Sequence, residues 1–276
     1  MSSELDATEP VDVVRNVLVE APADATYYLL DPPWEYVAAL AEVGAEFDPD
    51  ELPTLRLLSE RGTLVTLRER FVAASQAANL VEADTLAVRE RAGSADGPLI
   101  VGEDEVHAPL LADGTGAILS ADEGSFLPAA REAAETAWET AEDFSLRTPA
   151  LDRLRSTMDA DLGDRFRDDF EASLSHVVGQ RDVETAEFEA VTAAVLVAAK
   201  NETLHYDLSR WGEEVGLASK ATFSRRKGEL EDLGVVTTEK VPVEMGRPRQ
   251  RLMLTDEYAD ALDDGGVEGL VGRVAV

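Results

Sequence analysis

Apolar residues recur at helical spacing in three consecutive segments between residues 184 and 234. Such spacing predicts three amphipathic helices, each with one buried face. The apolar positions are Phe188, Val191, Val195 and Ala198 in the first segment, Leu204, Leu208, Trp211 and Val215 in the second, and Phe223, Leu230 and Leu233 in the third. Gly216 and Gly234 are expected to end the second and third helices, and Ser219 is expected to cap the start of the third.

A segment rich in β-branched residues follows over 235–241, and a second strand is expected over 250–254. A stretch with proline and glycine separates them, so they are predicted to pair as a two-stranded hairpin. Three helices followed by such a hairpin is the element order of a winged helix-turn-helix, in which the third helix is the recognition helix. We therefore expect a DNA-binding domain of this kind over residues 183–262, followed by a tail over 263–276.

Helical and strand patterns alternate through the first part of the chain. Helices are expected over 11–20, 34–43, 63–78 and from Ser125 to about Phe144, and strands over 25–30, 54–58, 85–89, 99–101, 106–111 and 116–119. Asp113-Gly114 predicts a hairpin turn between the last two strands, and Ser125 an N-cap. This alternation indicates an α/β domain with a mixed sheet over residues 1–145, acting as a sensor or dimerisation domain.

Two further helices are expected between these regions, over 151–158 and 162–178, after a break at Pro149. We assign them to a helical connector over residues 146–182, which is also a candidate dimer surface. One winged helix covers only one half-site of DNA, so the chain is expected to be a homodimer.

The chain is strongly acidic, with 56 Asp plus Glu against 25 Lys plus Arg and a net charge of −31. The charges are spread over the predicted elements, which argues against a disordered acidic tail. This acidity is typical of a protein from the salt-saturated cytoplasm of a halophilic archaeon, because molar salt screens the self-repulsion. The sequence contains no cysteine and no apolar run long enough to span a membrane. Residues 1–10 are acidic and polar, so we expect no secretory signal and a cytoplasmic protein.

Basic residues are concentrated in one part of this acidic chain. All four lysines, Lys200, Lys220, Lys227 and Lys240, lie within residues 200–254, where ten Lys plus Arg face nine Asp plus Glu. A basic island of this kind indicates contact with phosphates, and the expected partner is double-stranded promoter DNA. The residues expected to contact DNA are Ser219, Lys220, Thr222, Ser224, Arg225 and Arg226 on the third helix and Arg247, Arg249 and Arg251 on the wing.

Five segments carry a resemblance to a known family. They are Leu52-Pro53-Thr54-Leu55-Arg56-Leu57-Leu58, Phe144-Ser145-Leu146-Arg147-Thr148-Pro149, Trp211-Gly212-Glu213, Ala218-Ser219-Lys220-Ala221-Thr222-Phe223-Ser224-Arg225 and Gly246-Arg247-Pro248-Arg249. Over most of its length the chain resembles the haloarchaeal TbsP family of transcriptional regulators. The resemblance implies a regulator that acts on promoters of central carbon metabolism.

The N-terminal part is also similar, more weakly, to the phospholipase-D-like sensor domain of archaeal sugar-responsive regulators. This similarity implies a small-molecule effector, a sugar or a sugar phosphate. Arg56, Arg61 and Arg68 are candidates to bind its phosphate.

Catalytic and metal-binding patterns are missing from the sequence. Residues 1–199 contain no lysine, so the His-x-Lys pair of a phospholipase-D-type hydrolase cannot form. His107, His176 and His205 are expected to be structural or exposed, and the acidic stretch 48–51 a solvated loop rather than a cation site. We expect no catalytic residue, no metal and no cofactor. Two alternatives to a DNA-binding regulator are an enzyme with a winged-helix adaptor and an interaction scaffold that does not bind DNA.

Overall fold

The computed structural model of the chain describes residues 9–93, 97–112, 115–122, 124–178, 186–243 and 248–259. The side chains of 175–178 and 186–189 are outside this description. The chain forms two compact units, Met1–Ala150 and Leu151–Val276.

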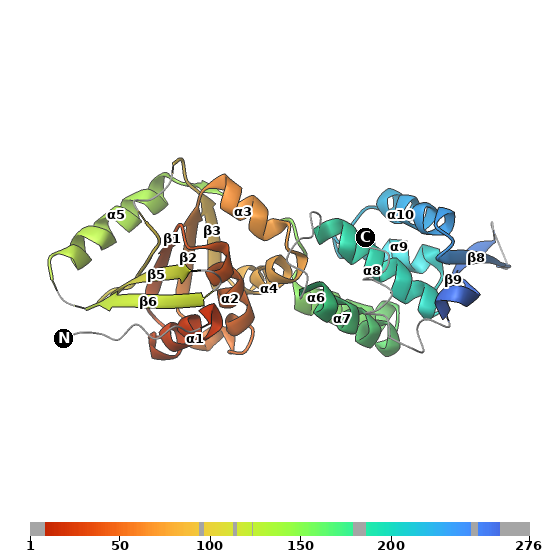
Figure 1. Ribbon diagram of the computed structural model, residues 1–276, viewed down its shortest axis with the longest axis horizontal. Coiled ribbons are helices and arrows are strands. Elements are labelled where there is room, and N and C mark those ends of the chain that lie inside the picture. Colours follow the sequence, from red (N-terminus) through yellow and green to blue (C-terminus); the bar gives the residue numbers. More distant parts are fainter. Residues whose placement is uncertain are drawn as a thin grey trace. The chain divides into compact units, whose positions relative to one another are not determined.

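The first unit is built on a mixed seven-stranded sheet with the strand order β6-β5-β4-β1-β2-β3-β7 (Figure 1). Its strands are β1 (Thr26–Leu30), β2 (Thr54–Ser59), β3 (Leu86–Glu90), β4 (Leu99–Val101), β5 (Val106–Ala112), β6 (Thr115–Ala121) and β7 (Glu142–Asp143). β1, β2 and β3 are parallel, and the remaining pairs are antiparallel. The expected α/β fold with a mixed sheet is therefore confirmed.

Helices cover both faces of this sheet. They are α1 (Pro10–Glu20), α2 (Trp34–Gly44), α3 (Arg61–Arg68), α4 (Phe71–Glu82) and α5 (Phe126–Thr140), with a 3-10 turn over Pro49–Glu51. Successive side chains of a strand point to opposite faces. Along β1, Tyr27 and Leu29 join a core shared with α1, α2 and α4. Tyr28 and Leu30 join a second core with α5, which Figure 1 shows apart from α1 and α2.

The prediction of one helix over 63–78 is wrong in one respect. The structure has two helices there, α3 and α4, with a break between them. Arg70 stands at the break with an extended backbone (φ −103°, ψ 90°). Its guanidinium carbon lies 3.7 Å from the ring centroid of Trp34. No glycine or proline marks this break in the sequence. The contact between Arg70 and Trp34 is the structural feature found at the break.

The helix that follows Ser125 also differs from expectation. Ser125 takes the N-cap position of α5, but its side chain makes no cap hydrogen bond. The helix ends at Thr140 rather than near Phe144, because the chain extends again and β7 pairs with β3. The expected turn residues 113–114 lie outside the described residues, although β5 and β6 pair antiparallel on both sides of them.

The second unit contains a winged helix-turn-helix, as expected. Its elements are α6 (Leu151–Asp161), α7 (Asp164–Val178), α8 (Ala186–Lys200), α9 (His205–Glu214), α10 (Lys220–Asp232), β8 (Val236–Val241) and β9 (Arg249–Leu254). β8 and β9 pair antiparallel and form the wing. Among the described residues, none of the helices has both the length and the apolar character that crossing a bilayer requires.

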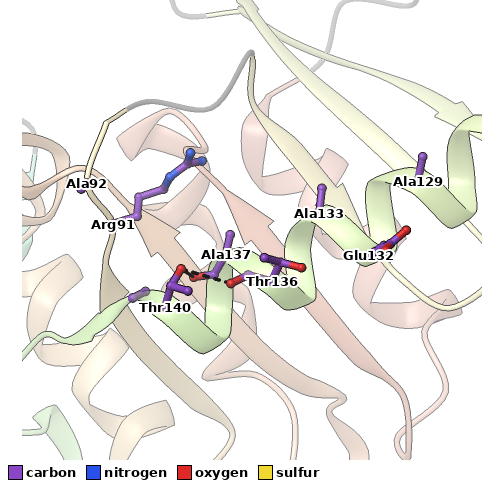
Figure 2. Close-up of a pocket in the computed structure, with 9 residues that line it drawn as sticks. Arg91, Ala92, Ala129, Glu132, Ala133, Thr136, Ala137 and Thr140 are labelled. Atoms are coloured by element: carbon purple, nitrogen blue, oxygen red, sulfur yellow. Dashed lines mark hydrogen bonds between the residues drawn. The ribbon is translucent and has the colours of Figure 1, made fainter.

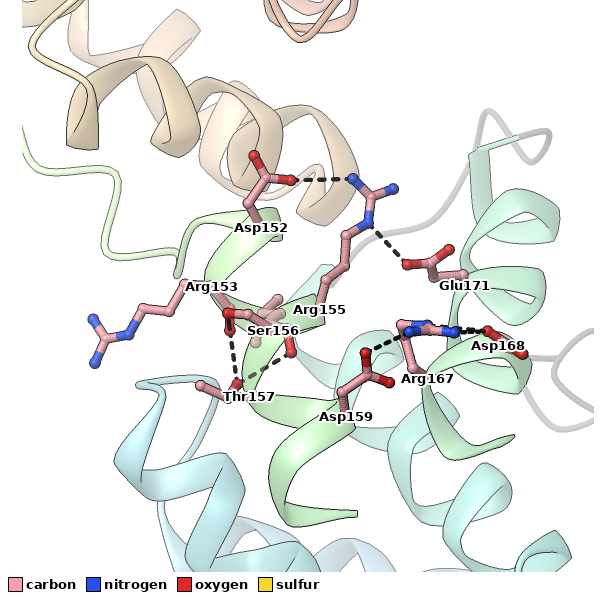
Figure 3. A network of polar contacts seen from close by, with 10 residues as sticks. Asp152, Arg153, Arg155, Ser156, Thr157, Asp159, Arg167, Asp168 and Glu171 are labelled. Atoms are coloured by element: carbon pink, nitrogen blue, oxygen red, sulfur yellow. Dashed lines mark hydrogen bonds and ion pairs between the residues drawn. The ribbon is translucent and has the colours of Figure 1, made fainter. Parts of the chain in front are cut away.

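The two helices expected as a connector pack inside this second unit. Trp211 of α9 donates from Nε1 to Thr157 Oγ1 of α6 at 3.0 Å, and its ring meets the edge of Phe166 of α7. Figure 3 shows the polar contacts between α6 and α7, among them an ion pair from Arg155 Nε to Glu171 Oε1 at 2.8 Å. The joint between the helices falls at 162–163 rather than at 159–161.

Candidate nucleic-acid interface

Helix α10 starts with the cap that the sequence predicts. Ser219 has an extended backbone, and its Oγ accepts a hydrogen bond from the Thr222 N–H at 3.1 Å. Before it, Gly216 takes the left-handed conformation with φ 80°. Gly212 of α9 lies against Phe223 of α10 so closely that a Cβ on Gly212 would be 2.2 Å from the Phe223 ring. The contact at Gly212 and the cap at Ser219 together fix the start of α10 and its orientation against α9.

The two sides of α10 differ in exposure. Phe223 and Leu230 are fully buried, whereas Lys220, Ser224 and Arg225 are exposed. The Arg225 side chain is 67% exposed, and its ion pair with Glu229 spans 4.0 Å. The outer side of α10 therefore presents a hydroxyl and two cations to solvent.

Two expectations about α10 need correction. Leu233 was expected on the buried face, but it is 63% exposed because it forms the C-cap of the helix. Arg226 was expected at the DNA, yet it is only 6% exposed. Its Nε donates to Thr192 Oγ1 of α8 at 2.6 Å and its Nη1 to Glu229 at 2.9 Å. We therefore assign Arg226 to the packing of α10 on α8 and leave it out of the interface.

The wing presents Arg249 and Arg251 on one face of β9, since residues two apart in a strand point the same way. Arg251 lies opposite Glu239 of β8 and pairs with it at 3.4 Å. Arg249 Nη1 pairs with Asp207 Oδ1 at 3.2 Å, and its guanidinium carbon lies 4.0 Å from the ring centroid of Tyr206. Arg247 lies outside the described residues.

Tyr206 and Asp207 are site residues that sequence reasoning missed. Both lie in the first turn of α9, and Tyr206 is 47% exposed. Together they hold Arg249 of the wing against the start of α9. Tyr206 does not belong to the apolar helical pattern of this segment, and an aromatic residue outside that pattern was the signal available in the sequence.

Carboxylates of the same unit neutralise most of the exposed cations at this surface. Lys220 Nζ pairs with Glu213 at 2.7 Å. Hydrogen bonding to this carboxylate raises the pKa of Lys220, and the same bond lowers the pKa of Glu213. DNA phosphates must compete with these carboxylates, so the surface is balanced rather than strongly basic.

His205 is the first residue of α9 and directly precedes Tyr206 in the chain. Burial lowers the pKa of His205, and the charge of Lys227 lowers it further, while a hydrogen bond with the Phe223 backbone acts the other way. Lys227 is itself mostly covered and reaches Glu231 at 3.1 Å and Gln250 at 3.2 Å. The long aliphatic stem of this lysine is mostly covered, while its ammonium group reaches these polar partners at the surface.

The arginines expected to bind a phosphate in the first unit have different surroundings. Arg56 donates to the Tyr28 hydroxyl at 2.6 Å and lies over the Trp138 ring. Arg61 pairs with Glu90 at 2.8 Å, and Arg68 lies over the ring of Phe144. Among the described residues, the three arginines therefore share no partner in these contacts.

The remaining candidate groups are the other two histidines and the acidic stretch before β2. His107 is buried, with Nδ1 at 2.7 Å from Ser120 Oγ, its cross-strand neighbour. The side chain of His176 is outside the description. Residues 49–51 form an exposed 3-10 turn. Within the described ranges no group of three or more His, Asp or Glu side chains is arranged to hold a metal ion.

Two family models match the chain and together cover nearly all of it. Residues 2–149 match the model described as the N-terminal domain of TbsP-like transcriptional regulators. Residues 150–273 match the C-terminal helix-turn-helix domain of the same regulators. No curated protein and no solved structure matched the chain.

Proposed function

This chain belongs to the TbsP-like family of transcriptional regulators, and we propose that it binds promoter DNA sequence-specifically as a homodimer. In this proposal α10 enters the major groove and the wing follows the adjacent backbone. The regulated genes are those of central carbon metabolism in a halophilic archaeon. A metabolite bound by the first unit changes the affinity for DNA.

The observation that carries this proposal is the outer side of α10. Arg225 there is 67% exposed and loosely paired, so its fork can give two donors to a guanine edge. Lys220 and Ser224 flank it at the start of the helix. The cap at Ser219 and the contact between Gly212 and Phe223 hold this side outward.

The wing supports the same proposal. Arg249 is held by Tyr206 and Asp207 at the start of α9, where free helix N–H groups favour a phosphate. Arg251 lies on the same strand face, paired with Glu239. We expect these arginines to contact phosphates, and Arg247 to extend the contact at the turn of the wing.

The test is a titration of the full chain on labelled promoter fragments, followed by fluorescence anisotropy at several KCl concentrations up to the molar range. Promoters of central carbon metabolism should bind more tightly than a random duplex of equal length. Binding should first strengthen with KCl, because salt screens the repulsion between DNA and a body with a net charge of −31, and then weaken through counterion competition. Equal affinity for all duplexes at every salt concentration contradicts sequence-specific binding, and no binding at all favours the scaffold.

The targets and the metabolite response need a measurement in cells. Genome-wide occupancy of the tagged protein, with and without a sugar as carbon source, should show promoters of carbon metabolism and a change in occupancy between the two conditions. If occupancy at these promoters is the same in both conditions, the metabolite response is contradicted, while the DNA-binding role is still supported.

A further inference from the structure

The carboxyl ends of the three parallel strands of the first unit lie next to one another. Asp31, Glu60 and Arg91 directly follow β1, β2 and β3. Asp31 Oδ1 accepts from the Glu60 N–H at 3.1 Å, and Asp31 Oδ2 pairs with Arg91 Nη1 at 3.3 Å. One carboxylate therefore ties all three strand ends together. In open α/β sheets, this edge is where ligands bind.

The backbone turns sharply at Asp31, directly after β1. Its φ of 42° lies in the left-handed region, which aspartate adopts more readily than most residues other than glycine. Here the bonds from Asp31 to Glu60 and Arg91 hold it, and they also orient the Arg91 guanidinium.

A hollow of about 690 Å³ opens between this strand edge and one flank of α5 (Figure 2). Pockets of roughly 300–1,000 Å³ are the usual size for small ligands. The residues that line it include Arg91, Glu132, Ala133, Thr136, Ala137 and Thr140. Alanine side chains on α5 leave the space open, and in Figure 2 the Arg91 side chain extends from the end of β3 toward α5.

The charges around the hollow are unevenly placed. Among the described residues that line it, Arg91 is the one basic residue and Glu132 the one acid. Figure 2 shows Glu132 further along α5 than Ala137 and Thr140. Glu132 and Thr140 are two helical turns apart, roughly 12 Å at 1.5 Å per residue. The Thr140 end of the hollow is therefore distant from this acid.

We propose that this hollow binds a small hydroxylated anion, whose carboxylate or phosphate is held by Arg91 and whose hydroxyl groups meet Thr136 and Thr140. A planar guanidinium suits either oxyanion because it can donate two parallel hydrogen bonds. The inference rests on the proposed regulatory function and places its effector at the strand ends rather than on Arg56, Arg61 or Arg68. In a chain with a net charge of −31, an anion needs such an oriented cation to bind.

The test uses three probes with one carbon skeleton and different charge: glycerate, glycerol phosphate and uncharged glycerol. The thermal midpoint of the full chain is measured against each probe at one fixed molar KCl concentration, since a ligand of the folded state raises this midpoint. We expect at least one of the two anions to raise the midpoint, and glycerol to leave it unchanged. Whichever anion acts identifies the oxyanion as a carboxylate or a phosphate.

Two variants and two matched controls locate the site. Arg91→Gln removes the cation, and Ala133→Phe fills the hollow while leaving Arg91 and Asp31 intact. Each should weaken binding of the active anion by about tenfold to a hundredfold. For Arg91→Gln this is the loss expected for a hydrogen bond to a charged group, and for Ala133→Phe it follows because the ring occupies the space of the anion. Arg61→Gln alters the exposed arginine after β2, and Glu139→Phe adds the same ring to α5 outside the hollow. Both controls should bind the anion as the unaltered chain does.

Three results overturn the proposal: no shift with either anion, an equal shift with glycerol, or full binding in both Arg91→Gln and Ala133→Phe. If Arg91→Gln does not fold, Ala133→Phe decides alone. Promoter binding measured without any probe tests the proposed regulatory function separately. A chain that binds DNA but ignores all three probes refutes only the effector site.

Discussion

At the scale of single residues, the arginines of the DNA surface differ in what they can read. Arg225 is exposed on the outer side of α10, whereas Arg249 is stacked on Tyr206 beside the start of α9. Arg225→Ala should cost ~1–3 kcal/mol of binding free energy and flatten the preference among operator variants. Arg249→Ala should weaken all sequences about equally and reduce the salt slope by about one.

The measurement is a titration of both variants against a small operator library at several KCl concentrations. The opposite pattern is that Arg225→Ala keeps the full sequence preference and Arg249→Ala loses it. That result would show that the wing recognises the base sequence and that α10 contacts the DNA backbone.

Arg226 should act on stability rather than on recognition. Its guanidinium is buried and bonds to Thr192 and Glu229. Arg226→Ala leaves the Thr192 hydroxyl buried without this donor, so the free energy of unfolding should fall by about 1–3 kcal/mol. Urea unfolding at fixed KCl measures the loss. The ranking of operator variants by the folded protein should stay the same; a changed ranking would return Arg226 to the interface.

His205 should make the second unit sensitive to acid. Its folded pKa lies below the usual 6.5, mainly because of burial. The unfolded chain therefore binds the proton more readily than the folded one, and stability is lost as pH falls below about 6.5, by up to about 1.4 kcal/mol per pH unit. Above that pH this contribution is complete.

Unfolding midpoints of the full chain and of His205→Asn between pH 7.5 and pH 5.5 should differ in slope, with the variant less sensitive. Carboxylates titrate in both proteins, so their contribution cancels in the comparison. Parallel slopes would show that His205 titrates alike in both states.

At the scale of elements, the crossing of α9 and α10 depends on one glycine. A Cβ on Gly212 would meet the Phe223 ring at 2.2 Å, and Phe223 is fully buried. Gly212→Ala should therefore destabilise the winged helix by about 1–3 kcal/mol through overpacking. Gly228 of α10 is the matched control, because a Cβ there meets nothing within 4 Å.

Gly228→Ala should stabilise the unit by about 0.5–1 kcal/mol, since alanine has the higher helix propensity. The two variants are compared by urea unfolding under one set of conditions. A loss of stability in Gly228→Ala as large as that in Gly212→Ala would show that the close contact is not the cause.

At the scale of the whole molecule, the proposed function requires two copies of the chain. A winged helix reads one half-site, and the described residues of one chain form one winged helix. Light scattering of the full chain in molar KCl, where self-repulsion is screened, should give twice the chain mass of 29.8 kDa. The fragments 1–150 and 151–276, measured in the same way, show which unit carries the contact. A monomer at micromolar concentration rejects the homodimer.

Most elements of the fold follow from local sequence. Period-two and period-3.6 patterns predicted the strands of the mixed sheet and the helices of the winged helix-turn-helix, because burial of one face imposes those periods. Ser219 was predicted as a cap because its hydroxyl satisfies a free N–H of the same helix turn. Such features depend on residues close together in the chain, so the sequence alone is enough to place them.

Other features were decided only by the tertiary structure, because they depend on residues far apart in the chain. The break between α3 and α4 lies at Arg70, which stacks on Trp34. Arg226 is buried because α8 brings Thr192 to it, although Arg225 next to it on α10 is exposed. Arg91 and Asp31 meet because parallel strands align their carboxyl ends. Spacing along a chain gives the side of an element on which a residue lies, but only packing decides whether that side meets solvent, a ligand or another helix.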